Sequence, residues 1–193
     1  MEKGRLEAFS DGVIAVIITI MVLELHIPHG KEWSDLTPLC AKFFCYVLSF
    51  INVGLYWNNH HHLFQAVKHV DGRILWTNLH LLFWLSLIPV STDWMGENNF
   101  EQTPVIFYGF ILLMCGVAYY FLVNALINRH GRDSVIAKAI GRDVKGKISV
   151  VSYLVAIGLG FINPWLSLGI YLIISATWLI PDTRFENALL AKK

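Results

Sequence analysis

The sequence predicts an all-α membrane protein: a single transmembrane domain, residues 1–193, that crosses the bilayer six times with both termini in the cytoplasm. Three observations support this fold class. The chain is 55% hydrophobic and only 15% charged, whereas soluble domains carry roughly 25% charged residues. Its apolar residues form segments of the length that a transmembrane helix needs. Its basic residues fall almost entirely on one side of those segments.

The first predicted span, residues 8–27, is long enough as a helix to cross a hydrocarbon core of ~30 Å. It opens on a polar stretch that includes Ser10 and Asp11 and then becomes almost wholly aliphatic, interrupted up to Leu25 only by Thr19 and Glu24. Four of its aliphatic residues share one helical face, at spacings of four, three and four: Val16, Ile20, Leu23 and Ile27. Such a face can meet lipid, protein or water, and the spacing alone does not decide among them.

Five further spans are predicted, at residues 36–63, 74–93, 104–128, 147–162 and 164–181. The second has Lys42 near one end and a polar cluster near the other, and the fourth contains no charge. The last two are short. We separate them at Asn163-Pro164, because proline pushes the preceding residue out of the helical conformation.

The distribution of basic residues predicts the orientation. Of the fifteen lysine and arginine residues, thirteen fall on one side of six spans, and only Lys31 and Lys42 fall on the other. The positive-inside rule then places both termini in the cytoplasm of a multi-pass protein of the inner (plasma) membrane. The basic segment 129–147 is either a solvated helix at the headgroup level or a contact for anionic membrane lipid.

Several function classes are excluded. A net charge of +1, with scattered basic residues, gives no case for a nucleic-acid partner. The three cysteines lie in apolar segments without CxxC spacing, and three consecutive histidines on a helix point about 100° apart, so no metal site is predicted. No P-loop, glycine-rich phosphate motif or nucleophile motif occurs. We therefore expect no enzyme activity and no cofactor.

Ionisable groups inside predicted spans indicate where polar contacts join helices, because an unpaired charge in lipid is costly. Asp11 lies one turn inside the first span, and Arg5 is too far along the helix to share its face. Its partners are therefore expected on the second and third spans, which carry polar residues at similar depth. The predicted motif and inter-helix network comprises Arg5, Phe9, Ser10, Asp11, Trp57, His61 and Asn78, and which of His60, His61 and His62 faces the core stays open.

Glu24 has two interpretations. It lies near the predicted outer end of the first span, where a carboxylate can extend to the interface and stay hydrated. Alternatively, it forms an acidic outer vestibule that raises the local concentration of cations.

The segment Arg5-Leu6-Glu7-Ala8-Phe9-Ser10-Asp11 resembles the RxxxFSD signature that opens the first helix of the endolysosomal potassium channel family (transmembrane protein 175). Further similarities to the second helix of that family, its following turn and its third helix are found at Trp57, His60–His62, Leu63, Phe64, Asp71, Asn78, Pro89 and Thr92. The resemblance covers the first half of the chain strongly, and the rest by length and number of spans.

The resemblance implies a potassium-permeable cation channel without a filter of the TVGYG kind, assembled as a homotetramer of single-repeat subunits. It implies that the first helix of each subunit lines the pore, with aliphatic rings as constriction and gate. Seven residues after Phe9, the narrow ring falls on Val16, where the family more often has isoleucine or leucine. The next layers are Ile20 and Leu23, and Thr19 supplies a hydroxyl beside the constriction.

Two other functions are compatible with six spans. A proton-coupled secondary transporter would use Asp11 and the His60–His62 cluster as a relay, but the interrupted helices and internal repeats typical of such proteins are not seen. A structural or lipid-binding membrane protein would use the aliphatic stripe of the first helix only to pack subunits together.

Overall fold

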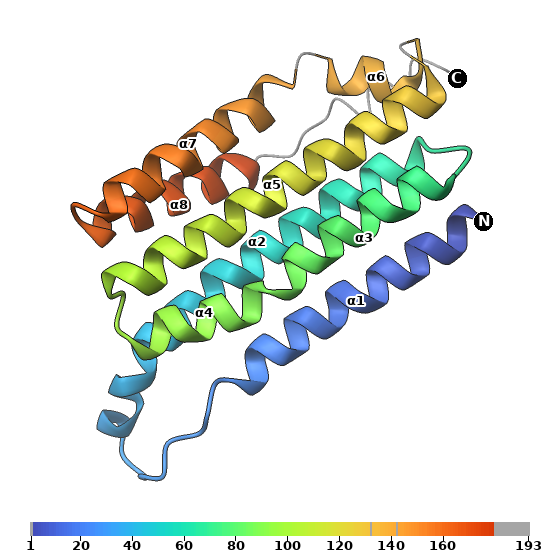
Figure 1. Cartoon of the computed structure of the whole chain (residues 1–193). Helices are drawn as coiled ribbons and strands as arrows, with labels where there is room; N and C mark the ends of the chain where they lie inside the picture. Colours follow the sequence, from blue (N-terminus) through green and yellow to red (C-terminus); the bar gives the residue numbers. More distant parts are fainter. Residues whose placement is uncertain (1, 132, 142, 180–193) are drawn as a thin grey trace.

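The computed structural model describes residues 2–131, 133–141 and 143–179, which form helices joined by turns and contain no β-strand. Most of the helices lie side by side with their axes nearly aligned, with α1 at one edge of the bundle and α7 and α8 at the other (Figure 1). The elements in chain order are α1 (Lys3–Leu23), the 3-10 helix η1 (Trp33–Leu39), α2 (Cys40–Gln65), α3 (Gly72–Ser86), α4 (Ile88–Glu97), α5 (Gln102–His130), α6 (Val135–Ile140), α7 (Val144–Gly160) and α8 (Pro164–Leu179).

The central helix is α5, which packs against α3, α4, α7 and α8. It is uncharged from Gln102 to Asn128 and apolar around its whole circumference, which is typical of a buried helix. Its buried residues include Tyr108, Leu112 and Leu122, all fully enclosed by neighbouring helices. This packing explains why the cleanest apolar segment of the sequence forms the middle of the bundle.

Four helical segments in the described part are long and apolar enough to cross a membrane: Lys3–Leu23, Trp33–Gln65, Gly72–Glu97 and Gln102–His130. The fold is therefore that of a multi-pass, all-helical membrane protein. The helices α7 and α8 are shorter, with 17 and 16 residues. Residues 180 and 181 of the last predicted span lie outside the described residues. The count of six spans stays a prediction.

The first helix differs from its predicted bounds. It begins at Lys3, so that the polar signature up to Asp11 is helical, and it ends at Leu23, with Glu24 as its C-cap. Ile27 therefore lies beyond the helix and does not continue the face of Val16, which corrects the four-residue stripe predicted from spacing. Pro28 keeps Ile27 out of a helical conformation, because proline pushes the residue before it towards an extended one.

The predicted third span is two helices, α3 and α4, which meet at Leu87. Pro89 causes the break, because it lacks the N–H that would continue the hydrogen bonds of α3. At the far end of α4, Lys42 of α2 forms ion pairs with Glu97 at 2.8 Å and with Asp93 at 3.3 Å. These pairs hold the start of α2 and the end of α4 together.

Candidate ion pathway along the first helix

The inward face of α1 is a stripe of buried residues. Because α1 contacts α2, α3 and α4, this face is covered by three neighbouring helices. The stripe runs along the helix at spacings of four, four, three and four, through Leu6, Ser10, Ile14, Ile17 and Met21. Only Ser10 in this stripe is polar, which marks it as a point of specific contact with a neighbouring helix.

The opposite face of α1 is aliphatic and uncovered. The exposed fractions of Val16, Ile20 and Leu23 are 55%, 41% and 74%, and Phe9 is exposed by 55%. An apolar face that continues over several turns requires lipid or another protein surface to cover it. All the residues of α1 predicted to line a pore are therefore exposed and not covered by its own bundle.

Thr19 is the polar residue on this uncovered face. Its hydroxyl donates a hydrogen bond to the carbonyl oxygen of Val16, with an oxygen–oxygen distance of 2.9 Å. Because the hydroxyl proton is used by the backbone, the oxygen keeps lone pairs that can accept a hydrogen bond or contact a cation. Thr19 thus places an oxygen acceptor on the uncovered face, next to the carbonyl of Val16.

A buried chain of hydrogen bonds joins α1, α3 and α2. Ser10 donates to the carbonyl of Leu6 at 2.9 Å, and its Oγ accepts from Asn78 Nδ2, also at 2.9 Å. The Oδ1 of Asn78 in turn accepts from His60 Nε2 at 2.8 Å. All three side chains are at most 2% exposed, so each polar group depends on its partner.

A second, exposed contact joins α1 and α2. Trp57 Nε1 donates to the Oδ1 of Asp11 at 3.0 Å. The indole of Trp57 stacks on the ring of His61, with centroids 5.8 Å apart, and Gln65 Nε2 lies 3.0 Å from His61 Nε2. The side chain of Arg5 is exposed and forms no hydrogen bond or ion pair with the described residues.

Five residues of the predicted network therefore form two separate groups of contacts, Ser10 with Asn78 and Asp11 with Trp57 and His61, whereas Arg5 and Phe9 belong to neither. His61, which the sequence hypothesis selected, lies on the surface with Trp57, and the histidine bonded to Asn78 is His60. The helical spacing of His60 from buried Val53, Leu63 and Phe64 is the signal that indicates the buried histidine. Within the described residues, the histidines do not belong to any group of three or more metal-ligating side chains.

We expect Asp11→Asn to destabilise the protein by about 1 kcal/mol, because the Trp57 hydrogen bond loses the charge of its acceptor. The midpoint of thermal unfolding in detergent measures this effect. Trp57→Phe should reduce the stability by a similar amount. The double variant Asp11→Asn/Trp57→Phe should lose less stability than the sum of the two single losses. Glu7→Gln is the control, since Glu7 only forms an ion pair with Lys3 on the same helix, at 3.6 Å. If the two single losses of stability simply add in the double variant, the hydrogen bond between Trp57 and Asp11 contributes nothing to stability.

Comparisons with known proteins complete this picture. Residues 5–89 match the model of a family described as the endosomal/lysosomal potassium channel TMEM175. The chain is 52% identical over 189 residues to a protein of Chryseobacterium sp. (strain P1-3) named as a potassium channel, with 98% of each chain covered. It is 35% identical over 116 residues to the Homo sapiens endosomal/lysosomal proton channel TMEM175, covering 54% of this chain and 23% of that protein.

A solved structure is also similar. It is the crystal structure of a lysosomal potassium-selective channel TMEM175 homolog from Chamaesiphon minutus, with a TM-score of 0.80 and 30% sequence identity. The similarity covers 94% of this chain and 98% of that chain, so it extends beyond the segment that the family model matches.

Proposed function

Since the chain belongs to the family of the endosomal/lysosomal potassium channel TMEM175, we propose that it is a potassium-permeable cation channel of the inner (plasma) membrane. The family and the relatives are ion channels, so the prediction that the chain is not an enzyme is confirmed. The observation that carries the proposal is the uncovered aliphatic face of α1, with one threonine hydroxyl on it.

In the proposed channel, α1 of each subunit lines the pore and Val16 forms the narrowest ring. Ile20 and Leu23 form the next layers towards the outer end of the helix. Aliphatic rings offer no oxygen ligands, so an ion crosses with part of its water shell, and the same rings close the pore when they lose water. Thr19 supplies the oxygen that replaces part of the lost hydration. Glu24, half-buried at the end of α1, contributes to an acidic outer vestibule.

We propose a homotetramer with six crossings per subunit and cytoplasmic termini. The uncovered face of α1 supports self-association, because a pore lined by α1 requires the first helices of several subunits to face a common axis. The start of α1, the α2–α3 turn and α6 lie at one end of the bundle, and they carry Lys3, Lys68 and Lys138 (Figure 1). Five more basic residues assigned to this side lie outside the described residues: Arg132, Arg142, Arg184, Lys192 and Lys193. The short helices α7 and α8 provide the last two crossings, and local thinning of the bilayer accommodates their length.

Thr19→Ala tests the role of α1 in selectivity. We expect the potassium-to-sodium permeability ratio to fall about threefold, because the pore loses the only side-chain oxygen beside the constriction. Reversal potentials in a planar bilayer, under a potassium-against-sodium gradient, measure the ratio. Thr177→Ala is the matched control, since Thr177 of α8 makes the same bond to a carbonyl three residues earlier, at 2.7 Å. Equal ratios in the two variants would remove Thr19 from the pathway.

The same protein in liposomes separates a channel from a proton-coupled transporter. A channel carries potassium down its own gradient without any need for a proton gradient. Potassium flux that requires a proton gradient, and that is lost when His60 is replaced, would favour the transporter instead.

A further inference from the structure

A cavity of about 500 Å³ lies between α2, α5, α7 and α8. None of its lining residues belongs to α1, and α7 and α8 lie at the edge of the bundle opposite α1 (Figure 1), so the cavity is apart from the proposed ion pathway. Its volume falls within the ~300–1,000 Å³ that is typical of small-molecule sites, and such sites are mostly apolar with a few polar groups.

The middle of the cavity is lined mainly by apolar groups. Gly116 of α5 leaves space there, since a Cβ at this position would lie 3.6 Å from Val150 and 3.8 Å from the hydroxyl of Tyr56. Two polar side chains of this part are already engaged: Ser149 accepts from Trp178 Nε1 at 2.9 Å, and Asn52 is bonded to Leu48 and Ser175. The rest of the lining of this part is apolar apart from the hydroxyls of Tyr56 and Tyr153. This region therefore suits a hydrocarbon chain better than a polar ligand.

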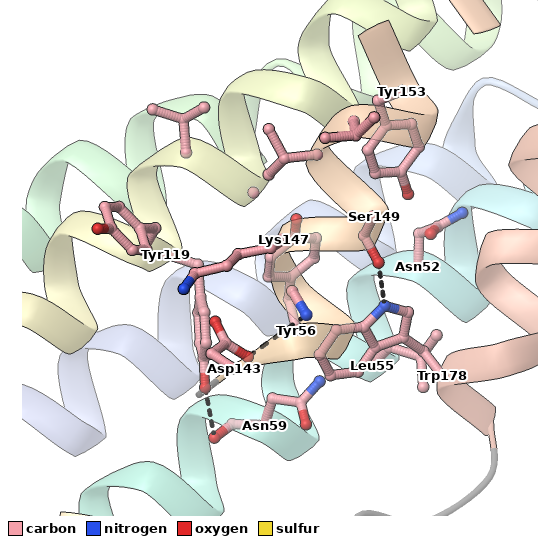
Figure 2. A pocket seen from close by; sticks show the side chains of 16 residues that line it. Asn52, Leu55, Tyr56, Asn59, Tyr119, Asp143, Lys147, Ser149, Tyr153 and Trp178 are labelled. Atoms are coloured by element: carbon pink, nitrogen blue, oxygen red, sulfur yellow. Dashed lines mark hydrogen bonds between the residues drawn. The ribbon is translucent and has the colours of Figure 1, made fainter. Parts of the chain in front are cut away.

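The end of the cavity near the start of α7 is polar (Figure 2). Asp143 caps α7 by accepting from the backbone N–H of Gly146 at 3.3 Å, so its charge is partly compensated by the helix dipole. Lys147 is exposed and has no ion pair within the described residues, and the side-chain amide of Asn59 makes no hydrogen bond there. Two hydrogen-bond donors, one of them cationic, are thus available to a ligand.

The cavity also reaches the surface of the bundle. Its rim includes Tyr120 of α5 and Val151 of α7, which are exposed by 46% and 59%. In a membrane these two side chains are next to lipid, so the cavity is accessible to molecules of the bilayer.

We propose that this cavity binds a phospholipid of the surrounding leaflet, with one acyl chain between α2, α5 and α7 and the phosphate at Lys147 and Asn59. A single basic group above an apolar cavity between membrane helices matches the two parts of a phospholipid, an anionic phosphate and a hydrocarbon chain. The bound lipid links the α7–α8 pair to the central helices. The proposal depends on the membrane fold and not on ion conduction.

Native mass spectrometry of the whole protein, delipidated and then incubated with phosphatidylglycerol, measures this binding. We expect one tightly held phospholipid per chain. Gly116→Leu should reduce its retention at least about tenfold, because the leucine side chain occupies the space of several methylene groups. Gly158→Leu is the matched control, since a side chain at this exposed position of α7 meets nothing within 4 Å. Equal retention in the two variants, or no retained phospholipid in the unmodified protein, would overturn the proposal.

A second pair of variants tests the phosphate contact. Lys147→Gln should weaken retention about fivefold, the size of one basic contact to an anionic lipid. Lys138→Gln, at an exposed position of α6 on the same end of the bundle, should leave it unchanged. Incubation with oleic acid distinguishes the source of the hydrocarbon chain. Tighter retention of oleic acid than of phosphatidylglycerol would identify a free fatty acid as the ligand and overturn the assignment to a phospholipid.

Discussion

Val16→Asn is expected to raise the single-channel conductance about tenfold, which corresponds to a barrier lowered by ~1.4 kcal/mol. The reason is that the proposed constriction consists only of aliphatic groups, which exclude water and provide no ligand for a dehydrated ion. Asparagine is close to valine in size but offers both hydrogen-bond donors and an acceptor. Single-channel recording in a planar bilayer, with equal potassium concentrations on both sides, measures the effect directly.

The control for this experiment lies on the same helix. Val22 is exposed by 45%, close to the 55% of Val16, but it points about 120° away around α1. We expect Val22→Asn to leave the conductance unchanged. Because neither position belongs to the buried stripe of α1, both variants should fold and assemble. An unchanged conductance and reversal potential for Val16→Asn would show that α1 does not form the constriction.

Asn78→Leu is expected to destabilise the protein by about 2–4 kcal/mol. The amide is the middle member of the buried chain from Ser10 to His60, and its loss leaves the Nε2–H of His60 without an acceptor. The contact between α1 and α3 is weakened at the same time. Thermal unfolding in detergent measures the loss of stability, and size-exclusion chromatography measures how much of the proposed oligomer survives.

Two further variants make this result specific. Asn124→Leu is the matched control, because the Asn124 amide only donates to the carbonyl of Tyr120 in its own helix, at 2.8 Å. The double variant His60→Phe/Asn78→Leu should recover part of the lost stability, since it removes the unpaired donor together with its acceptor. If Asn78→Leu costs no more than Asn124→Leu, the buried chain does not hold α1 in place.

Segment length and hydropathy predicted most of the helices to within a few residues of their observed positions. The exceptions have local causes that can be named. Pro28 keeps Ile27 out of the helix, and Pro89 divides the predicted third span into α3 and α4. Both prolines are visible in the sequence, but hydropathy averaged over a long apolar run gives no weight to a missing backbone N–H.

For the candidate site, the sequence predicted some features, and others required the structure. The signature around Ser10 and Asp11, with its resemblance to a channel family, is a property of the sequence alone. The sequence alone does not show that His60, and not His61, is the buried histidine. Neighbouring histidines on a helix differ only in the direction they point, and the position of α3 decides which of them is buried. The cavity beside Gly116 likewise arises from four helices that are distant in sequence.

By itself the sequence determined the membrane class, the approximate positions of its apolar helices and the polar signature at the start of α1. Only the tertiary structure decided which side of α1 is covered by the bundle and which side is free. The physical reason is that α1 is apolar on both sides, with Ile14 and Ile17 on one and Val16 and Ile20 on the other. Hydrophobicity does not distinguish two such faces, and the buried face is the one where Ser10 meets Asn78 of α3.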